Sequence, residues 1–469
     1  MPAPEAFDEV LEPASGRLLA RIPRDGPAEV AAAVEAAAGA WPGWRDTPVT
    51  ERVQLLFRYK AILEREREEL SRLVSRENGK LLEDARGEVR RGIEVVDFAC
   101  GMPTLLMGET VEGIARGLDS HTVRVPLGAV AGICPFNFPA MIPLWMFPVA
   151  IAAGDTFVLK PSERTPLTAM RLAELLAEAG APAGILRVVH GARETSDALI
   201  DHPAVRAVSF VGSEPVARHV YARAAAAGKR VQALAGAKNH LIVMPDADLD
   251  AAARAVLSSA YGAAGQRCLA GSVALPVGDA GDRLVAAVAS AAARMAPGDP
   301  LLEDSALGPV IRGDARARIA AWIAKGVEEG ARAVVDGRRP AGTPPPGGFF
   351  LGPTLLDGVR PDMSVAREEI FGPVLSVIRA TSLEEAIEIA NRSRYGNAAS
   401  IFTRSGAAAH AFRTRIQAGM VGVNVGVAAP MAFFPFAGWK GSFFGDLHAT
   451  GKDSVRFYTE TRVVIERWA

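Results

Sequence analysis

The chain has 469 residues, of which 49% are hydrophobic, 22% charged and 6% aromatic. These fractions are typical of a folded globular protein, and they exclude a disordered chain, a collagen-like repeat and a coiled coil. Lys and Arg number 52 against 53 Asp and Glu, a net charge of −1, so the composition lacks the basic excess of a nucleic-acid-binding protein. The length predicts roughly two to four domains.

The first predicted helix spans Val53–Val74, where apolar residues recur at helical spacing and the charged run Glu64–Glu69 is expected to face solvent. Further along, no charged side chain occurs between Arg124 and Asp155, a stretch long enough to cross a bilayer. Five prolines interrupt this stretch, and Asn137 lies in its middle. Because lipid could not satisfy the backbone around these prolines, we predict that the segment is protein interior.

Strands and helices alternate from Asp155 onward. Strand–helix–strand units in series predict a parallel, doubly wound α/β sheet that binds ligands beyond the carboxyl ends of its strands. The predicted strands are Thr156–Lys160, Ile185–His190, Val205–Val211 and Arg230–Leu234, and the helices between them are Pro166–Ala179, Glu194–Asp201 and Glu214–Ala227.

A second alternating block follows and predicts a second α/β domain. The Pro- and Gly-rich piece Pro340–Gly348 within it is a loop on composition. The predicted strands are Leu241–Met244, Ser272–Pro276, Val374–Ile378, Ser400–Phe402 and Val421–Asn424, and the helices are Leu249–Tyr261, Arg316–Glu328 and Leu383–Asn391.

The cysteines are few and odd in number, which is typical of reduced thiols in a cytoplasmic protein. The N-terminus carries Glu5, Asp8 and Glu9 instead of an apolar stretch, so we expect no secretory signal. The cysteines are Cys100, Cys134 and Cys268.

Cys268 is the candidate nucleophile, in the run Gly265-Gln266-Arg267-Cys268 between a predicted helix and a predicted strand. A reactive thiol needs a lowered pKa or positive surroundings, which Arg267 could supply. Free cysteines are usually buried and inert, and we apply that alternative to Cys100 and Cys134. The polar flanks and the loop position favour reactivity for Cys268.

Asn137 places one amide in an apolar loop bounded by Pro135 and Pro139. A buried amide is a neutral donor suited to stabilising an oxyanion where water is excluded. The alternative is an Asn that hydrogen-bonds to its own turn.

The segments that follow two of the predicted strands suit a nucleotide. Glu163, shortly after Lys160, could accept hydrogen bonds from ribose hydroxyls and would repel a 2′-phosphate, which favours NAD over NADP. Ser213 after Gly212 predicts a helix start that can face a phosphate. The alternatives are that Lys160 is a solvated loop lysine and that the helix start at Ser213 faces water. No Gly-x-Gly-x-x-Gly fingerprint of a standard dinucleotide-binding fold follows a strand.

The seven histidines show no metal-ligand spacing with one another or with the cysteines, so we predict no metal.

Together these motifs resemble the aldehyde dehydrogenase superfamily, in order and almost end to end. Within it, the chain is most similar to the CoA-acylating methylmalonate-semialdehyde dehydrogenases, through Gly236–His240 and Phe433–His448. The motifs that carry the resemblance are the Asn137 loop, Lys160-Pro-Ser-Glu163, Phe210-Val-Gly212-Ser213, Gly265-Gln-Arg-Cys268 and Glu368-Glu369-Ile-Phe371-Gly-Pro.

The resemblance implies a fold of two doubly wound α/β domains with a small β oligomerisation element. The implied cofactor domain is 1–108 and 126–234 with part of 430–452, the catalytic domain is 235–429, and the oligomerisation hairpin and strand are 109–125 and 453–469. It also implies a homodimer or homotetramer that acts on a small-molecule semialdehyde with NAD and CoA.

The resemblance also assigns roles to residues. Cys268 would be the nucleophile, with an oxyanion hole made by the Asn137 amide and the Cys268 backbone N–H. Arg91 and Arg267 match arginines that hold the substrate carboxylate, although most arginines of the chain must be surface residues. The residues that would contact NAD are Cys134, Phe136, Lys160, Glu163, Arg164, Gly212, Ser213, Glu369 and Phe371.

One departure from hydrolytic relatives concerns Leu234, which occupies the position of a Glu that activates water in those enzymes. A general base is typically worth about 10²–10⁴ in rate, and leucine cannot accept a proton. The thioacyl enzyme should therefore wait for a thiol, which needs less help, and this favours CoA as the acyl acceptor. The alternatives are a hydrolytic semialdehyde dehydrogenase with its base elsewhere, and a catalytically silent relative.

Overall fold

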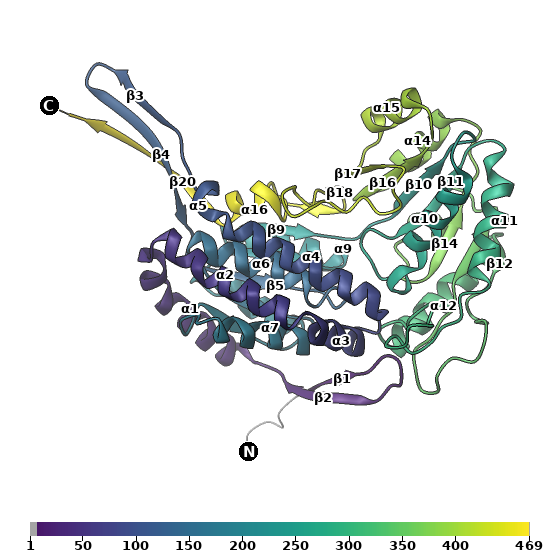
Figure 1. Ribbon diagram of the computed structural model, residues 1–469, viewed down its shortest axis with the longest axis horizontal. Coiled ribbons are helices and arrows are strands. Elements are labelled where there is room, and N and C mark those ends of the chain that lie inside the picture. Colours follow the sequence, from purple (N-terminus) through teal and green to yellow (C-terminus); the bar gives the residue numbers. More distant parts are fainter. Residues whose placement is uncertain (1–6, 469) are drawn as a thin grey trace.

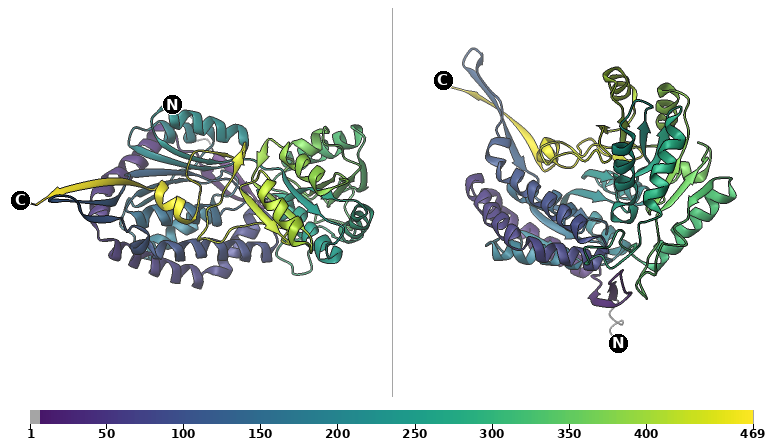
Figure 2. Two further views of the ribbon diagram at one scale, coloured as in Figure 1. Left: turned by 90° about the horizontal axis from the view of Figure 1, so that it is seen from above. Right: turned by 45° about the vertical axis from the view of Figure 1, so that its right-hand side comes forward.

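The protein folds into two sheet-containing lobes and a projecting arm, as described by a computed structural model of residues 7–468 (Figure 1). Figure 2 shows the second lobe packed beside one end of the first, with the arm pointing away from both. The fold class expected from the sequence is confirmed. Glu5, part of the acidic N-terminus, lies outside the described residues.

The first lobe is built on a sheet with the strand order β19-β9-β8-β5-β6-β7. The strands β5 to β9 are parallel to their neighbours, and β19 pairs antiparallel with β9. The strands are β5 (Ala129–Ile133), β6 (Thr156–Lys160), β7 (Leu186–Val188), β8 (Val205–Val211), β9 (Arg230–Leu234) and β19 (Phe443–Phe444), and the connecting helices are α6 (Met141–Ala153), α7 (Leu167–Glu178), α8 (Arg193–Asp201) and α9 (Glu214–Ala226).

The uncharged segment lies in the interior of this lobe, as predicted. It forms β5 and α6, and every residue of α6 after Met141 is buried. No helix within residues 7–468 is long and apolar enough to cross a membrane.

Helices from the N-terminal part of the chain pack beside this sheet (Figure 1). The helix predicted over Val53–Val74 is two helices that meet at Glu66, where the backbone (φ −88°, ψ 4°) departs from helical geometry. The elements are β1 (Phe7–Leu11), β2 (Leu18–Pro23), α1 (Pro27–Asp46), α2 (Val49–Arg65), α3 (Arg67–Asn78), α4 (Leu82–Cys100) and α5 (Met102–Leu105).

The second lobe is built on a sheet with the strand order β12-β13-β14-β11-β10-β16-β17, parallel except for the β12–β13 pair. Its strands are β10 (Asn239–Val243), β11 (Gly271–Pro276), β12 (Arg332–Val335), β13 (Thr354–Asp357), β14 (Val374–Val377), β16 (Ala398–Phe402) and β17 (Met420–Val423). Its helices are α10 (Leu249–Tyr261), the 3₁₀ turn η1 (Gly262–Gly265), α11 (Ala280–Ala292), α12 (Gly313–Glu328), α13 (Ser364–Arg367), α14 (Leu383–Asn391) and α15 (Gly406–Arg415).

The arm is a sheet of β3 (Thr110–Ala115), β4 (Leu118–Pro126) and β20 (Thr459–Arg467). It joins the predicted hairpin to the C-terminal strand in antiparallel register, from Thr459 opposite Pro126 to Arg467 opposite Leu118. After β17 the chain returns to the arm through β18 (Trp439–Lys440), β19 and α16 (Gly451–Phe457), and β18 pairs antiparallel with β15 (Tyr395–Gly396).

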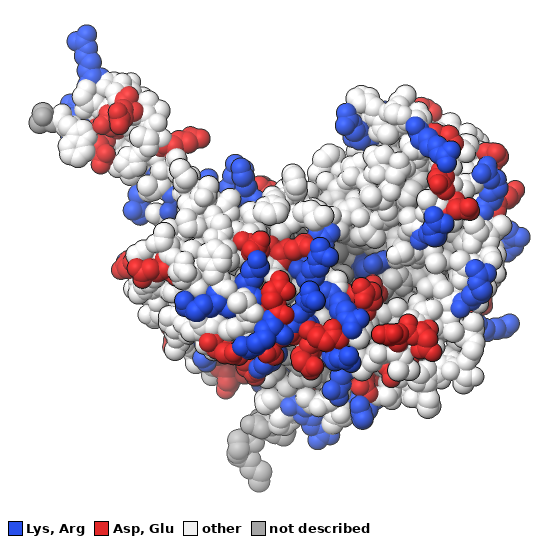
Figure 3. Space-filling view, viewed as in Figure 1, with Lys and Arg blue, Asp and Glu red and all other residues white. Residues whose placement is uncertain are grey.

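Charged side chains of both signs are interspersed on the face seen in Figure 3, in keeping with the near-zero net charge.

Candidate active site

Cys268 lies where two cavities meet. It lines a cavity of about 280 Å³ on the side of α4 and a larger one of about 860 Å³ at the carboxyl ends of the first sheet. Its backbone carbonyl accepts hydrogen bonds from Asn239 Nδ2 at 2.8 Å and Asn397 Nδ2 at 2.9 Å. These asparagines lie at the starts of β10 and β16, so strands of the second lobe position the Cys268 backbone at the boundary with the first lobe. Sequence reasoning gave neither Asn239 nor Asn397 a role.

The backbone just before Cys268 adopts a strained turn. Ala263 and Ala264 have φ of 50° and 52°, in the left-handed region that L-residues rarely occupy. The Ala263 amide donates to Asp84 Oδ2 of α4 at 3.0 Å. A Cβ at Gly265, where φ is 69°, would lie 2.1 Å from the Gly372 carbonyl, so this position requires glycine. The surrounding contacts therefore fix the path of the chain into Cys268.

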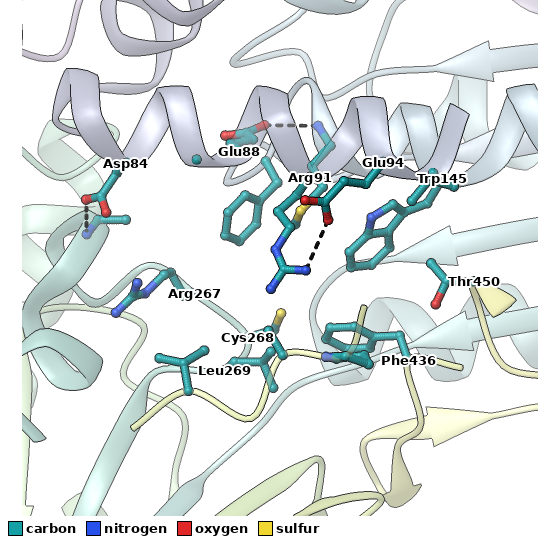
Figure 4. A pocket seen from close by; sticks show the side chains of 18 of the residues that line it. Asp84, Glu88, Arg91, Glu94, Trp145, Arg267, Cys268, Leu269, Phe436 and Thr450 are labelled. Carbon is teal, nitrogen blue, oxygen red and sulfur yellow. Dashed lines mark hydrogen bonds and ion pairs between the residues drawn. The ribbon is translucent and has the colours of Figure 1, made fainter. Parts of the chain in front are cut away.

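The electrostatic surroundings of Cys268 differ from the sequence expectation. The pKa of the thiol is raised to about 12, first by burial and then by the carboxylate of Glu369, and the opposing effect of Arg267 is smaller. The Arg267 guanidinium donates to the carbonyls of Ser258 and Ser259 at 2.5 and 3.0 Å and points away from Cys268 (Figure 4). Arg267 therefore does not make Cys268 a thiolate in the free protein.

Arg91 lies above Cys268 in the smaller cavity (Figure 4). Its Nη1 is 3.2 Å from Glu94 Oε2, one helical turn further along α4. Arg267 lines the same cavity, and its buried Nε has no hydrogen-bond partner among the residues described. The structure thus brings both predicted carboxylate-binding arginines to the cavity, with the guanidinium of Arg91 over the sulfur and Arg267 beside it.

The walls of this smaller cavity are mainly apolar. Trp145 and Phe436 pack with ring centroids 4.9 Å apart, and Phe138 and Leu269 also line the cavity. The acidic side chains of the lining are engaged elsewhere: Glu83 with Arg86, Asp84 with the Ala263 amide, Glu88 with Lys80, and Glu94 with Arg91.

The Asn137 side chain is buried beside the segment that leads to Cys268. Its Nδ2 donates to the Gln266 carbonyl at 3.0 Å, which leaves the second amide hydrogen for another acceptor. Leu234 is buried at the end of β9, in the apolar cluster against which Cys268 packs. An aliphatic side chain therefore occupies this position in the structure.

The larger cavity collects the residues expected to bind the cofactor. It is lined by Cys134, Phe136, Lys160, Glu163, Arg164, Gly212, Ser213, Glu369 and Phe371. These residues follow β5, β6 and β8 or come from the second lobe, so the cavity lies at the sheet edge where α/β proteins bind ligands. Burial raises the pKa of the Cys134 thiol, which is consistent with an inert cysteine.

Polar groups of this cavity are arranged at two places. The Lys160 ammonium is 3.8 Å from Glu163 Oε2, and burial lowers the pKa of Lys160. On the other side, Glu369 Oε1 accepts from the Ala237 amide at 2.9 Å, and burial raises the pKa of Glu369 to about 7. Phe136 and Phe371 meet edge to face with centroids 5.9 Å apart.

No group of three or more His, Cys, Asp or Glu side chains suited to a metal ion occurs in the part of the chain that the structure describes.

Comparison with known proteins finds similarity along nearly the whole chain. Residues 3–464 match the profile of the aldehyde dehydrogenase family. Malonate-semialdehyde dehydrogenase 2 of Geobacillus thermodenitrificans is 57% identical over 458 residues, which cover 98% of this chain and 95% of the relative. Malonate-semialdehyde dehydrogenase 3 of Geobacillus kaustophilus is 55% identical with the same coverage.

Solved structures are similar to the same extent. Methylmalonate-semialdehyde dehydrogenase from Oceanimonas doudoroffii superposes with a TM-score of 0.98 at 46% identity, covering 100% of this chain and 96% of that one. A Sinorhizobium meliloti 1021 protein that is assigned the same name and is complexed with NAD gives a TM-score of 0.97 at 46% identity, covering 99% and 95%.

Proposed function

The chain belongs to the aldehyde dehydrogenase family, and we propose that it oxidises malonate or methylmalonate semialdehyde with NAD and passes the acyl group to CoA with loss of CO₂. The observation that carries this proposal is the position of Cys268, which opens to a cavity containing Arg91 on one side and to a nucleotide-sized cavity on the other. The names of the similar proteins support the substrate class.

The residues of the larger cavity fit NAD. The Ser213 hydroxyl caps no amide in the described chain, so the first N–H groups of α9 are free to bind phosphate oxygens. A Cβ at Gly212 would lie 2.5 Å from Phe210 Cζ, so a larger residue in this turn would have to displace the Phe210 ring. Lys160 and Glu163 would hold ribose hydroxyls, and the NAD complex of the Sinorhizobium protein supports the choice of cofactor. When bound, NAD would supply the hydride acceptor.

Cys268 and Asn137 carry out the first bond change. The Cys268 sulfur attacks the aldehyde carbon, the thiol proton leaves to solvent, and the aldehyde oxygen becomes an anion. The free amide hydrogen of Asn137 and the backbone N–H of Cys268 stabilise that anion. Loss of hydride from the same carbon leaves an acyl group in thioester linkage to Cys268.

Arg91 and the Nε of Arg267 bind the carboxylate of this substrate. In the thioacyl enzyme, this carboxylate lies β to the thioester carbonyl. Its C–C bond breaks to release CO₂, and the electron pair moves toward the carbonyl oxygen that Asn137 stabilises. A proton then adds to the α-carbon, which gives acetyl or propanoyl thioester.

CoA is the proposed acceptor because the substrate cavity offers no free base. Leu234 cannot accept a proton, and the acids of the smaller cavity are paired with cations or amides. Attack by the CoA thiol breaks the Cys268–acyl bond and returns the Cys268 thiol.

Hydrolysis to a free acid is the second candidate, and one observation favours it. Glu369 lines the same cavity as Cys268 and has a pKa near 7, the range of an effective general base. Product identification separates the two functions. Purified protein given malonate semialdehyde, NAD and CoA should form acetyl-CoA by mass spectrometry, whereas a free acid as the sole product would contradict CoA transfer.

We further propose that the protein is a cytoplasmic homodimer or homotetramer that assembles through the arm. The exposed apolar side chains of Val463 and Ile465 on β20 support assembly through the arm. The domain boundaries given above are part of the same proposal. Sedimentation of the purified chain tests the assembly.

A further inference from the structure

A buried ion pair lies beneath the Asn137 loop. Lys80, just before α4, places its Nζ 2.5 Å from Glu88 Oε2, and both side chains are at most 1% exposed. The same Nζ donates to the backbone carbonyl of Asn137 at 2.6 Å and lies 4.1 Å from the ring centroid of Phe138. The pair therefore contacts the loop at the residue that bears the oxyanion-binding amide.

Glu88 holds the other end of the same loop. Its Oε1 accepts from the amides of Ala140 at 2.8 Å and Met141 at 3.1 Å, at the start of α6. Ahead of Asn137, the Phe136 carbonyl accepts from Asn78 Nδ2 at 2.9 Å. Side chains from 78–88 thus fix the backbone on both sides of Asn137.

Burial of charged groups is costly, and a buried pair is often no more stabilising than apolar residues of the same size. A role in placing the loop accounts for the pair better than stability does. Its hydrogen bonds end on the loop, whose Asn137 side chain continues to Gln266, two residues before Cys268. The contacts form one chain from Glu88 through Lys80 and Asn137 to the nucleophile segment.

We propose that Lys80 and Glu88 are positioning residues that aim the Asn137 amide at the oxyanion formed on attack by Cys268. This inference rests on the proposed function for the identity of the oxyanion. Lys80 and Glu88 act through Asn137, so they matter for the oxyanion step only while its amide is present.

A double-mutant cycle on an ester substrate tests this directly. With p-nitrophenyl acetate, Cys268 sulfur bonds to the acetyl carbon, p-nitrophenolate leaves, and the thiol proton goes to solvent. The step forms an oxyanion but needs neither NAD nor a semialdehyde. The variant is Lys80→Met with Glu88→Gln, which removes both charges and keeps an oxygen for the Ala140 and Met141 amides. Glu88→Gln alone enters the cycle if the double change prevents folding.

The expected result is a p-nitrophenolate burst slowed at least about tenfold by the double change when Asn137 is present, and altered less than about twofold in an Asn137→Ala background. The matched control is Lys60→Met with Asp97→Asn, which removes an ion pair of 2.6 Å on the exposed side of α4 and should leave the burst unchanged. The same slowing in both backgrounds, or none with Asn137 present, would overturn the inference.

Turnover of malonate semialdehyde by the wild type is measured in parallel. An intact p-nitrophenolate burst without semialdehyde turnover contradicts the proposed function. The double-mutant cycle on the burst still tests whether Lys80 and Glu88 position Asn137 in that case. A wild type with no burst from Cys268 contradicts both.

Discussion

Arg91 and Glu94 form an ion pair of 3.2 Å on one face of α4, and the pair leaves the Arg91 guanidinium over the sulfur of Cys268 (Figure 4). A guanidinium held in this way can bind a carboxylate two or three bonds from an aldehyde carbon that Cys268 attacks. Under the proposed function, Arg91 in this position would select short aldehydes that carry an acid group.

Arg91→Ala should weaken this selection. A hydrogen bond to a charged group contributes about 1.5–3 kcal/mol, so KM for malonate semialdehyde should rise about tenfold to a hundredfold while KM for propanal stays within about twofold. The comparison uses steady-state kinetics on both aldehydes, with Arg90→Ala as the control, because Arg90 also pairs with Glu94 but is mainly exposed. An equal rise for both aldehydes would remove the role assigned to Arg91.

The raised pKa of Cys268 predicts the pH dependence of its alkylation. Only the thiolate reacts, and a pKa near 12 means that its fraction grows tenfold per pH unit throughout the neutral and mildly alkaline range. The rate of iodoacetamide labelling of the free protein should therefore rise about tenfold per unit from pH 7 to pH 10, measured by mass spectrometry against a Cys268→Ser background. A plateau at pH 8 would show a thiolate already formed.

The pKa of Glu369 predicts how NAD binding changes with pH. As pH rises through about 7, the carboxyl loses its proton and becomes a stronger acceptor for ribose hydroxyls and a partner for the positive nicotinamide ring. The Kd for NAD, followed by fluorescence titration, should fall several-fold between pH 6 and pH 8, and Glu369→Gln should abolish the change. A Kd that varies equally in both proteins would assign the titration to another group.

Leu234→Glu should raise the rate of hydrolysis. A carboxylate at the end of β9 supplies the missing base, and general-base catalysis is typically worth about 10²–10⁴ in rate. We expect NADH production without CoA to rise at least about tenfold, whereas Leu234→Gln, similar in size but not basic, should leave it unchanged. No gain with a folded Leu234→Glu protein would mean that the leucine does not limit hydrolysis.

The regular elements flanked by clear turns could be predicted from the sequence. The strands β6, β8 and β9 and the helices α10 and α14 have the predicted bounds, because β-branched runs and helical spacing end at glycine, proline or polar residues. The helix α6 could not be predicted, since it is apolar on all sides and contains Pro143 and Pro148. Its amphipathic period is absent because the whole helix is buried.

The sequence motifs predicted residues that line the two cavities, namely Cys268, Asn137 and the cofactor segments, and the roles of these residues stay predictions. The contacts that hold these residues in place could not be predicted from the sequence. Lys80 and Asn137 are 57 residues apart, and Asp84 and Ala263 are 179 apart. Periodicity reports which face of an element is buried, but it carries no information on which distant loop that face meets. The pKa of Cys268 likewise depends more on burial and on Glu369 than on its neighbour Arg267.

The most direct measurement is NADH formation from malonate semialdehyde and NAD in the absence and presence of CoA. Without a thiol, the account predicts a burst of about one NADH per Cys268, followed by a steady rate at least about a hundredfold below that reached when CoA is added. Sustained NADH production at the full rate with no thiol present would contradict it.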